Sequence, residues 1–411
     1  MRGRLFTTLP LAVLVSAACA NGQEGDSRMS VRDSAGVQIV ENPGDLRVPG
    51  WTLSPEPTVS IGVLEGEPAY QLDQVRTALL QRDRIIVANS GSRELRYFDL
   101  DGRHVKTAGG RGGGPGEFQW ISWMAPHGRD SIITYDMQNR RFSIFDLEGQ
   151  FVRSFAPENT VFSVAGRFAD GSFVVPPLVV FMTGGTRQGL VRDSAVIVRF
   201  SPDGTGADTL VRVVAGESMV DSRESGGRSM IMVRNRPFGL STHIAVSDSL
   251  IFAGTGDAYQ IAVYARDGRL VRLIRRDRPR ARVGPAEIAA LRERQLSRIT
   301  DENRRRDEER WYAEAPYPDR MPAHGPLRVD DQGNLWVEEY SADRDAALRW
   351  TVFTAEGRAI GTTTTPARFS VHQIGSDFIL GRWQDDDDVD HVVVYRLERS
   401  GSRELAAGAA R

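Results

Sequence analysis

The stretch Leu95–Val105 (LRYFDLDGRHV) decides the fold, because the chain repeats it in related form, next as Phe142–Val152 (FSIFDLEGQFV). Further copies, the last without the glycine, lie at 197–204, 261–271, 350–357 and 391–395. Apolar and polar residues alternate up to an aromatic residue, and in five copies a glycine stands four positions later. Alternation predicts a half-buried strand, and Asp-Gly or Glu-Gly supplies the positive φ of a tight turn. Each copy therefore predicts a strand, a turn and a returning strand.

The repeating unit is longer than this hairpin. Another apolar strand precedes each copy, as at Arg84–Ala88 and Ser131–Tyr135, and a turn and a shorter apolar run precede that strand. Four antiparallel strands in roughly 40–50 residues are typical of a propeller blade. We therefore predict an all-β fold, a six-bladed β-propeller of four-stranded antiparallel blades over residues 35–400.

The last repeat, which ends near Leu397, supplies only three strands. Thr58–Gly62 reads as a strand and precedes the first complete blade, which starts near Leu72. An N-terminal strand that joins the final blade would close the ring and cover an otherwise exposed strand edge. We therefore predict ring closure by residues 58–62.

A glycine-rich join follows the first blade. The run Gly109–Phe118 (GGRGGGPGEF) matches the G-x-G-P-G-x-F join of NHL-type propellers, and the segments 84–107 and 33–42 match as well. Over residues 33–400 the chain resembles the bacterial NHL-related six-bladed β-propeller lipoproteins. The resemblance implies this fold and an exported, lipid-anchored protein, but it does not name a ligand, because propellers serve many roles.

The N-terminus carries an export signal, residues 1–18, with Arg2 and Arg4 before the apolar run Leu5–Val15. Cys19 resembles the acylated cysteine of a lipoprotein, although Ser16 stands where that motif usually has leucine. Ordinary cleavage after Ala20 is the alternative. We favour lipidation at Cys19, followed by a polar tether over residues 19–34.

The predicted location is therefore the cell envelope, as a membrane-anchored lipoprotein, or otherwise the periplasm or the exterior. No later stretch reaches the ~18 uninterrupted apolar residues of a membrane span. The lipid anchor is thus the predicted contact with the membrane, and residues 401–411 form a C-terminal tail.

The charge balance excludes one class of partner. The 411 residues carry a net charge of −2, so nothing favours nucleic acid. Lys106 is the single lysine among 52 basic residues, and we attribute this arginine excess to coding bias. Cys19 is the only cysteine, so no disulfide can form within the chain.

Long connections point to one face of the predicted propeller. By strand assignment they all lie on the same side, at 176–193, 216–240, 277–323, 340–347 and 382–390. Long loops on a rigid scaffold commonly carry binding function, so we expect binding on this face, although drift of surface loops gives the same pattern. The largest insertion, before the fifth blade, predicts a helical segment at about 284–312, either packed on the rim or serving as a lid or partner site.

Candidate ligand-binding residues come from blade joins, inner strands and the final loop. They are Arg111, Glu117, Trp120, Trp123, His243, His372, Trp383 and Asp385. We predict no metal and no cofactor, because no close-spaced histidine motif occurs and the run Asp385–Asp388 reads as a solvated hairpin tip. No Gly-x-Ser-x-Gly motif occurs either, and catalytic residues remain unknown.

Two functions follow. The first is a monomeric binding or scaffolding module for an unidentified glycan, peptide or envelope protein. The alternative is a propeller enzyme of lyase or lactonase type, with a metal-dependent site at the central channel. Because the sequence shows no pattern of metal ligands, we favour the binding or scaffolding module.

Overall fold

The computed structural model describes residues 29–178, 188–225 and 228–400. The predicted signal peptide 1–18, Cys19 and the C-terminal tail 401–411 lie outside these residues. Within them, no helix combines the length and the apolar character needed to cross a lipid bilayer.

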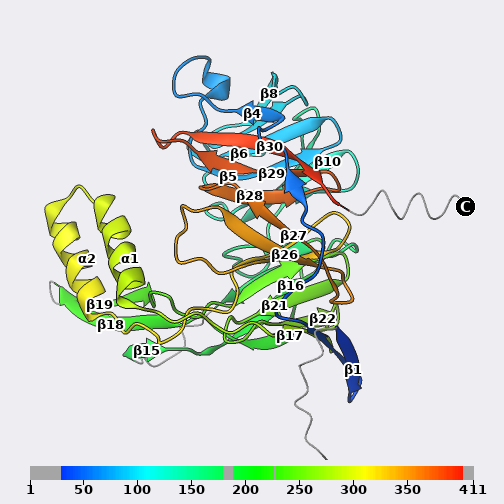
Figure 1. Ribbon diagram of the computed structural model, residues 1–411. Helices are drawn as coiled ribbons and strands as arrows, with labels where there is room; N and C mark the ends of the chain where they lie inside the picture. The colour runs from blue at the N-terminus through cyan, green and yellow to red at the C-terminus, as the bar shows by residue number, and fades with distance from the viewer. Residues whose placement is uncertain (1–28, 179–187, 226–227, 401–411) are drawn as a thin grey trace, which may run out of the picture.

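Six sheets follow one another along the chain as blades 1 to 6 (Figure 1). Blade 1 contains β5 (Val75–Gln81), β6 (Arg84–Asn89), β7 (Glu94–Phe98) and β8 (His104–Gly109). Blade 2 contains β9 (Ile121–Pro126), β10 (Ser131–Asp136), β11 (Arg141–Asp146) and β12 (Phe151–Phe155). Blade 3 contains β13 (Gly166–Arg167), β14 (Phe173–Leu178), β16 (Ser194–Phe200) and β17 (Ala207–Val214).

The second half of the ring repeats this plan. Blade 4 contains β20 (His243–Val246), β21 (Leu250–Gly254), β22 (Gln260–Ala265) and β23 (Leu270–Arg276). Blade 5 contains β24 (Leu327–Val329), β25 (Leu335–Glu338), β26 (Leu348–Phe353) and β27 (Ala359–Thr365). Blade 6 contains β28 (Phe369–Ile374), β29 (Phe378–Gln384) and β30 (Asp390–Glu398). The prediction of six antiparallel four-stranded blades is confirmed, with blade 6 completed from the N-terminus.

The repeated motif works through its turn and its aromatic residue. In blade 1, Asp99 Oδ1 accepts hydrogen bonds from the backbone N–H groups of Asp101 (3.0 Å) and Arg103 (2.8 Å), while Gly102 adopts a φ of 79°. The aromatic residue one position before that aspartate, Phe98, is fully buried. The same few residues therefore stabilise the hairpin turn and place a buried aromatic side chain in the core between neighbouring blades.

The core lies between neighbouring blades, because each sheet packs on both of its faces. Phe142 of blade 2 contacts Phe173 of blade 3 with ring centroids 4.5 Å apart, and Phe173 stacks on Phe200 at 5.3 Å. All three rings are buried. Burying such rings contributes a few kcal/mol each.

An N-terminal strand closes the ring. The strand β4 (Val59–Ile61) pairs antiparallel with β30, and Thr58 N–H donates to the Val394 carbonyl at 2.7 Å. The shorter β3 (Thr52–Leu53) pairs with the end of the same strand. Ring closure by residues 58–62 is therefore confirmed, and Ile61 is 1% exposed in the resulting core.

The closing strand ends a longer N-terminal segment, residues 37–61, here called the belt. Its first part, β2 (Val37–Asn42), runs parallel to β23 on the outer edge of blade 4. It then bonds to blade 5, where Trp51 N–H donates to the Thr362 carbonyl at 2.7 Å. The belt therefore joins blades 4, 5 and 6.

The prediction of a tether over residues 19–34 is wrong for its last five residues. Residues 30–34 form β1 (Ser30–Ser34), which pairs antiparallel with β2. The reason is the intervening turn, in which Gly36 has a φ of 81° and its N–H donates to Asp33 Oδ1 at 3.1 Å. A polar sequence thus continues the sheet of blade 4 outward, with all five residues of β1 exposed.

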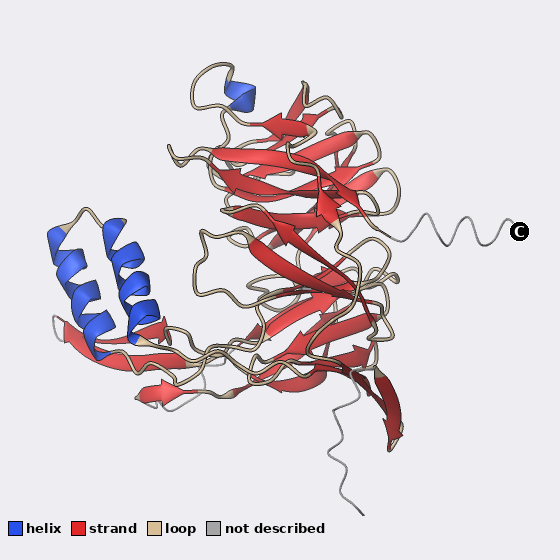
Figure 2. Cartoon of the chain, viewed as in Figure 1, coloured by secondary structure: helices blue, strands red, loops and turns tan. Residues whose placement is uncertain are grey.

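Three long connections combine into an arm on one side of the propeller (Figures 1 and 2). A separate sheet contains β15 (Gly189–Val191), β18 (Ser218–Ser225) and β19 (Arg228–Asn235). The helical insertion is two helices, α1 (Pro285–Ser297) and α2 (Glu302–Glu314), where one segment was expected. The break between them is set by Asp301, whose side chain caps the N-terminus of α2. Segments expected to be loops therefore carry strands.

Candidate functional site

A cavity of about 860 Å³ lies on the propeller axis, and residues from all six blades line it. One lining residue from each blade, in blade order, is Thr77, Trp123, Arg167, Val246, Val329 and His372. The lining also includes the first turn of blade 2, Gly128–Ser131. The cavity therefore opens toward the short turns between the first and second strands, at the end of the axis opposite the long connections and not on the face where binding was expected.

The cavity lining mixes apolar and polar groups. Leu79, Val246 and Val329 are apolar, whereas Thr77 and Gln373 bring polar atoms. The side chain of Gln373 accepts from Leu80 N–H (2.6 Å) and donates to the Leu80 carbonyl (3.1 Å), which ties blade 6 to blade 1. A concave cavity of this size with a few fixed polar groups is a default ligand site.

Two of the predicted site residues, His243 and His372, lie near the axis as neutral rings. Burial, followed by the positive charges of Arg328 and Arg382, lowers the pKa of His372 to about 3, and its Nδ1 has no hydrogen-bond partner among the described residues. Burial, followed by His324, Arg344 and Arg328, lowers the pKa of His243 to about 4. Both histidines therefore stay uncharged at neutral pH.

A second hollow, of about 300 Å³, lies at the long-connection end, between blades 5 and 6. We call it the arginine recess, because its lining includes Arg298, Arg328, Arg344, Arg368 and Arg382. Arg328 occupies the inner strand β24 and reaches solvent through the recess, while the protein packed around its guanidinium lowers the pKa of that group. The recess and the axial cavity thus occupy opposite ends of the propeller.

The glycine-rich join holds Arg111 and Glu117 away from both hollows. The Glu117 carboxylate accepts from Gly114 N–H at 2.7 Å, and the backbone of Arg111 bridges to Phe118. Arg141 donates to the carbonyls of Gly113, Gly114 and Glu117. Glu117 therefore shapes the crossing between blades 1 and 2.

The two tryptophans after this join have different environments. Trp120 receives the guanidinium of Arg76 over its ring, 4.6 Å from the ring centroid. Trp123 lines the axial cavity and packs edge-on against Phe142, with centroids 6.4 Å apart. Among the predicted residues, Trp123 and His372 are thus brought together in one cavity.

Trp383 and Asp385 belong to the hairpin of blade 6. Asp385 accepts from His391 Nε2 at 2.9 Å and from the N–H groups of Asp387 and Val389, and these bonds lower its pKa. The ring of Trp383 lies against His391, with centroids 5.3 Å apart. Both side chains hold the hairpin together.

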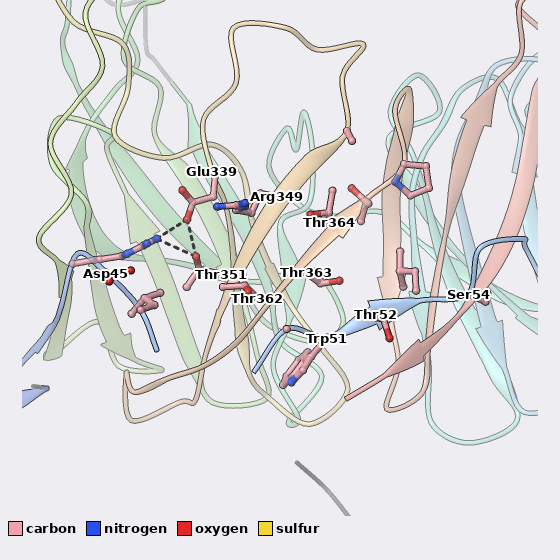
Figure 3. A pocket seen from close by; sticks show the side chains of 17 residues that line it. Asp45, Trp51, Thr52, Ser54, Glu339, Arg349, Thr351, Thr362, Thr363 and Thr364 are labelled. Carbon is pink, nitrogen blue, oxygen red and sulfur yellow. Dashed lines mark hydrogen bonds and ion pairs between the residues drawn. The ribbon is translucent and has the colours of Figure 1, made fainter. Parts of the chain in front are cut away.

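A groove of about 640 Å³ lies between the belt and blade 5 (Figure 3). Trp51 and Ser54 of the belt line it, together with hydroxyl groups of the outer strand β27, including Thr364. At one end Glu339 accepts from Arg276 (2.6 Å) and Thr351 (2.7 Å) and pairs with Arg278. This ion network fixes the belt side of blade 5, because the same Arg276 donates to the Gly44 carbonyl.

Metal-binding residues do not gather in the part of the chain that the structure describes: no three His, Cys, Asp or Glu side chains there are grouped to hold an ion. The histidine pair His243 and His324 has ring centroids 6.2 Å apart and no third ligand in such a group.

Sequence reasoning missed the arginines of the recess. Arg328 stands between Leu327 and Val329 in an innermost strand, where a charged residue is costly unless it faces a channel or a partner. That local signal was available, but a chain with one lysine among 52 basic residues makes any single arginine inconspicuous.

The protein is therefore a six-bladed β-propeller with a cavity on its axis. Residues 63–162 match the family DUF5128, described as a 6-bladed beta-propeller. The narrower resemblance to NHL-related lipoproteins stays a prediction. No curated protein sequence matches the chain.

Two solved structures are similar to this chain. A member of the DUF4221 family from Bacteroides vulgatus is 11% identical, with a TM-score of 0.50, and the match covers 86% of this chain and 100% of that one. A Bacteroides fragilis protein predicted to be exported is also 11% identical, with a TM-score of 0.48, covering 88% of this chain and 99% of that one. At this identity the likeness concerns the fold alone.

Proposed function

We propose that the protein is an exported, lipid-anchored β-propeller that binds a ligand of the cell envelope or the exterior at its central axis. The observation that carries the proposal is the cavity of about 860 Å³ to which every blade contributes. A packed core would fill such a space, because protein interiors leave few voids larger than a water molecule. Ligand sites of β-barrels are found at such mouths.

The ligand class follows from the lining. Trp123 offers an aromatic surface, and Thr77 and Gln373 offer neutral hydrogen-bonding groups. The lining also contains two residues of opposite charge, Arg167 and Asp248. Aromatic and neutral polar groups together suit a glycan or a peptide. The metal-dependent lyase or lactonase alternative has no supporting ligand cluster among the described residues.

Blocking the cavity tests the binding role. Thr77→Arg places a long side chain in the cavity, whereas the control Thr107→Arg places the same side chain on the exposed outer strand of the same blade. A glycan and peptide array should detect wild-type binding that Thr77→Arg abolishes and Thr107→Arg retains. Equal binding by both variants would refute an axial site.

Export and anchoring are tested separately. Cys19→Ser should move the protein from the membrane fraction to the soluble fraction. Without the cysteine, ordinary signal cleavage is the processing route that remains, and it attaches no acyl chain. Soluble, unacylated wild-type protein would refute the anchor without affecting the binding proposal.

A further inference from the structure

The lining of the arginine recess holds more arginines than carboxylates. Five arginines from five separate segments line it, against three carboxylates, Glu338, Asp345 and Asp388. One of the five, Arg298, directly follows α1 of the arm as its C-cap residue, so the arm and the propeller both contribute. Nothing in the propeller repeat calls for charge at this place, because inner strands normally supply apolar contacts between blades.

Most of these arginines have a carboxylate partner. Arg344 pairs with Glu338 at 2.6 Å, and Arg298 pairs with Asp345 at 3.2 Å. Arg368 contacts Asp386 (2.9 Å) and Asp388 (3.4 Å) at the exposed hairpin tip. These pairs hold the walls of the recess and account for its acidic residues.

Arg328 is the exception. Its guanidinium donates to the backbone carbonyls of Leu327 (3.1 Å) and Val371 (3.4 Å), and no carboxylate of the described residues lies within ion-pair distance. Its neighbour in the lining, Arg382, reaches Asp390 only at 3.6 Å, and the other oxygen of that carboxylate accepts from Val75 N–H. Among the five arginines that line the recess, Arg328 is therefore the one without a carboxylate partner in the part of the chain that the structure describes.

Two histidines on different strands respond to this charge. Arg328 and Arg382 add to the burial that lowers the pKa of His372, and Arg344 and Arg328 do the same at His243. Burial is the main cause at both rings, and the charge of Arg328 adds to it at each, so Arg328 disfavours a second cation beside it. An anion is favoured where cations are disfavoured.

We propose that the arginine recess binds an oxyanion, the carboxylate or phosphate group of a small ligand, with Arg328 as its main ionic partner. The guanidinium fork matches the two oxygens of either group. The lining also contains Ser370 and Gln384, which supply neutral donors. The inference rests on the proposed function, ligand binding at the axis. It adds that the recess binds an anionic group, at the end of the axis opposite the large cavity.

Glu338 makes the proposal sharper, because it is the carboxylate that competes with such a ligand. It is 4% exposed, burial raises its pKa, and the charge of Arg328 acts on it from beyond ion-pair distance. Replacing Glu338 with glutamine keeps its shape and removes its charge. Anion affinity should therefore rise in Glu338→Gln and fall in Arg328→Gln.

The test is titration calorimetry on the folded domain with sodium phosphate and sodium acetate as separate probes, at constant ionic strength. Arg328→Gln should weaken binding of the preferred probe tenfold or more, and Glu338→Gln should tighten it. The matched control is Arg349→Gln, an exposed arginine of the same blade that lines the belt groove and not the recess. The probe that binds more tightly identifies the source of the oxyanion as phosphate or carboxylate.

Three results would overturn the inference: no binding of either probe to folded wild type, equal losses in Arg328→Gln and Arg349→Gln, or weaker binding in Glu338→Gln. Melting curves of the ligand-free variants distinguish a lost site from a lost fold. If an array ligand still binds and Thr77→Arg alone abolishes it, the recess proposal fails while the axial binding function stands.

Discussion

Acid should destabilise the propeller through His243 and His372, because both rings must stay neutral while it is folded. The folded-state pKa of His243 is about 4 and that of His372 about 3, against 6.5 for the unconstrained side chain. As pH falls through 6.5, the unfolded chain binds protons that the folded chain does not, so the free energy of unfolding decreases. The loss continues down to the folded pKa values and is absent above 6.5.

The size of the effect follows from the shifts. Each pH unit below 6.5 costs about 1.4 kcal/mol per histidine, so each site loses about 2 kcal/mol between pH 7 and pH 5, about 4 kcal/mol together. Most carboxylates are still ionised at pH 5, which keeps the histidine contribution separable. Burial also lowers the pKa values of His127 and His324, so the wild-type decrease should exceed this two-site share.

The assay is urea denaturation of wild type and the His243→Gln/His372→Gln double variant at pH 7 and pH 5. The quantity compared is the change in unfolding free energy between the two pH values, which cancels any packing cost of the substitutions. The double variant should lose about 4 kcal/mol less than wild type. Equal losses would show that these histidines are protonated in the folded protein, and the proposed positive potential near Arg328 would lose its support.

The remaining predictions concern the belt. Ile61→Ala should lower the free energy of unfolding by about 2–5 kcal/mol in denaturant titrations, because the substitution opens a cavity at the closing strand. Deleting residues 35–65 should abolish cooperative melting, and unchanged melting of the deleted protein would refute closure by this strand. Asn42→Ala should cost about 1–3 kcal/mol, because it leaves the buried Ala359 N–H without its acceptor at 3.0 Å, and a neutral result would mean that blades 4 and 5 hold without this link. Gly361→Ala should displace Trp51, which an added Cβ would meet at 2.5 Å, and red-shift the tryptophan fluorescence; an unchanged spectrum would contradict the contact.

The blade pattern could be predicted from sequence because its determinants are local. An aspartate that caps its own turn, a glycine at positive φ and a buried aromatic residue lie within a few positions, as at Phe98, Asp99 and Gly102. Ring closure could also be predicted, because a final repeat with three strands leaves an edge that an N-terminal strand can fill.

The first part of the belt, β2, and the arm depend on distant partners, and sequence reasoning could not place them. Nothing within Val37–Asn42 indicates parallel pairing with β23, more than two hundred residues away along the chain. The strand β18 (SMVDSRES) lacks a regular apolar alternation, so it read as a loop. Its neighbours in the fold, β15 and β19, supply the hydrogen bonds that make it a strand.

The candidate site was predicted in part. Inner-strand position correctly placed Trp123, His243 and His372 near the axis, although their ligand contacts remain a prediction. Position alone could not assign Glu117 or Asp385, whose carboxylates accept backbone N–H groups of their own loops. The charge on Arg328 stands out only when the surrounding carboxylates can be counted in space.

The belt also determines when folding can finish. Residue Thr58 bonds to Val394, 336 positions later, so the ring stays open until almost the whole chain has been made. Joining two ends so far apart costs an open chain about 5 kcal/mol in loop entropy, which the preceding blades reduce by bringing the ends together. Until then the edges of β23 and β30 are unpaired and able to recruit strands from other molecules. The newly made chain is therefore vulnerable to aggregation and proteolysis between completion of blade 6 and docking of residues 37–61. Faster docking of the belt would shorten this interval without changing the folded protein.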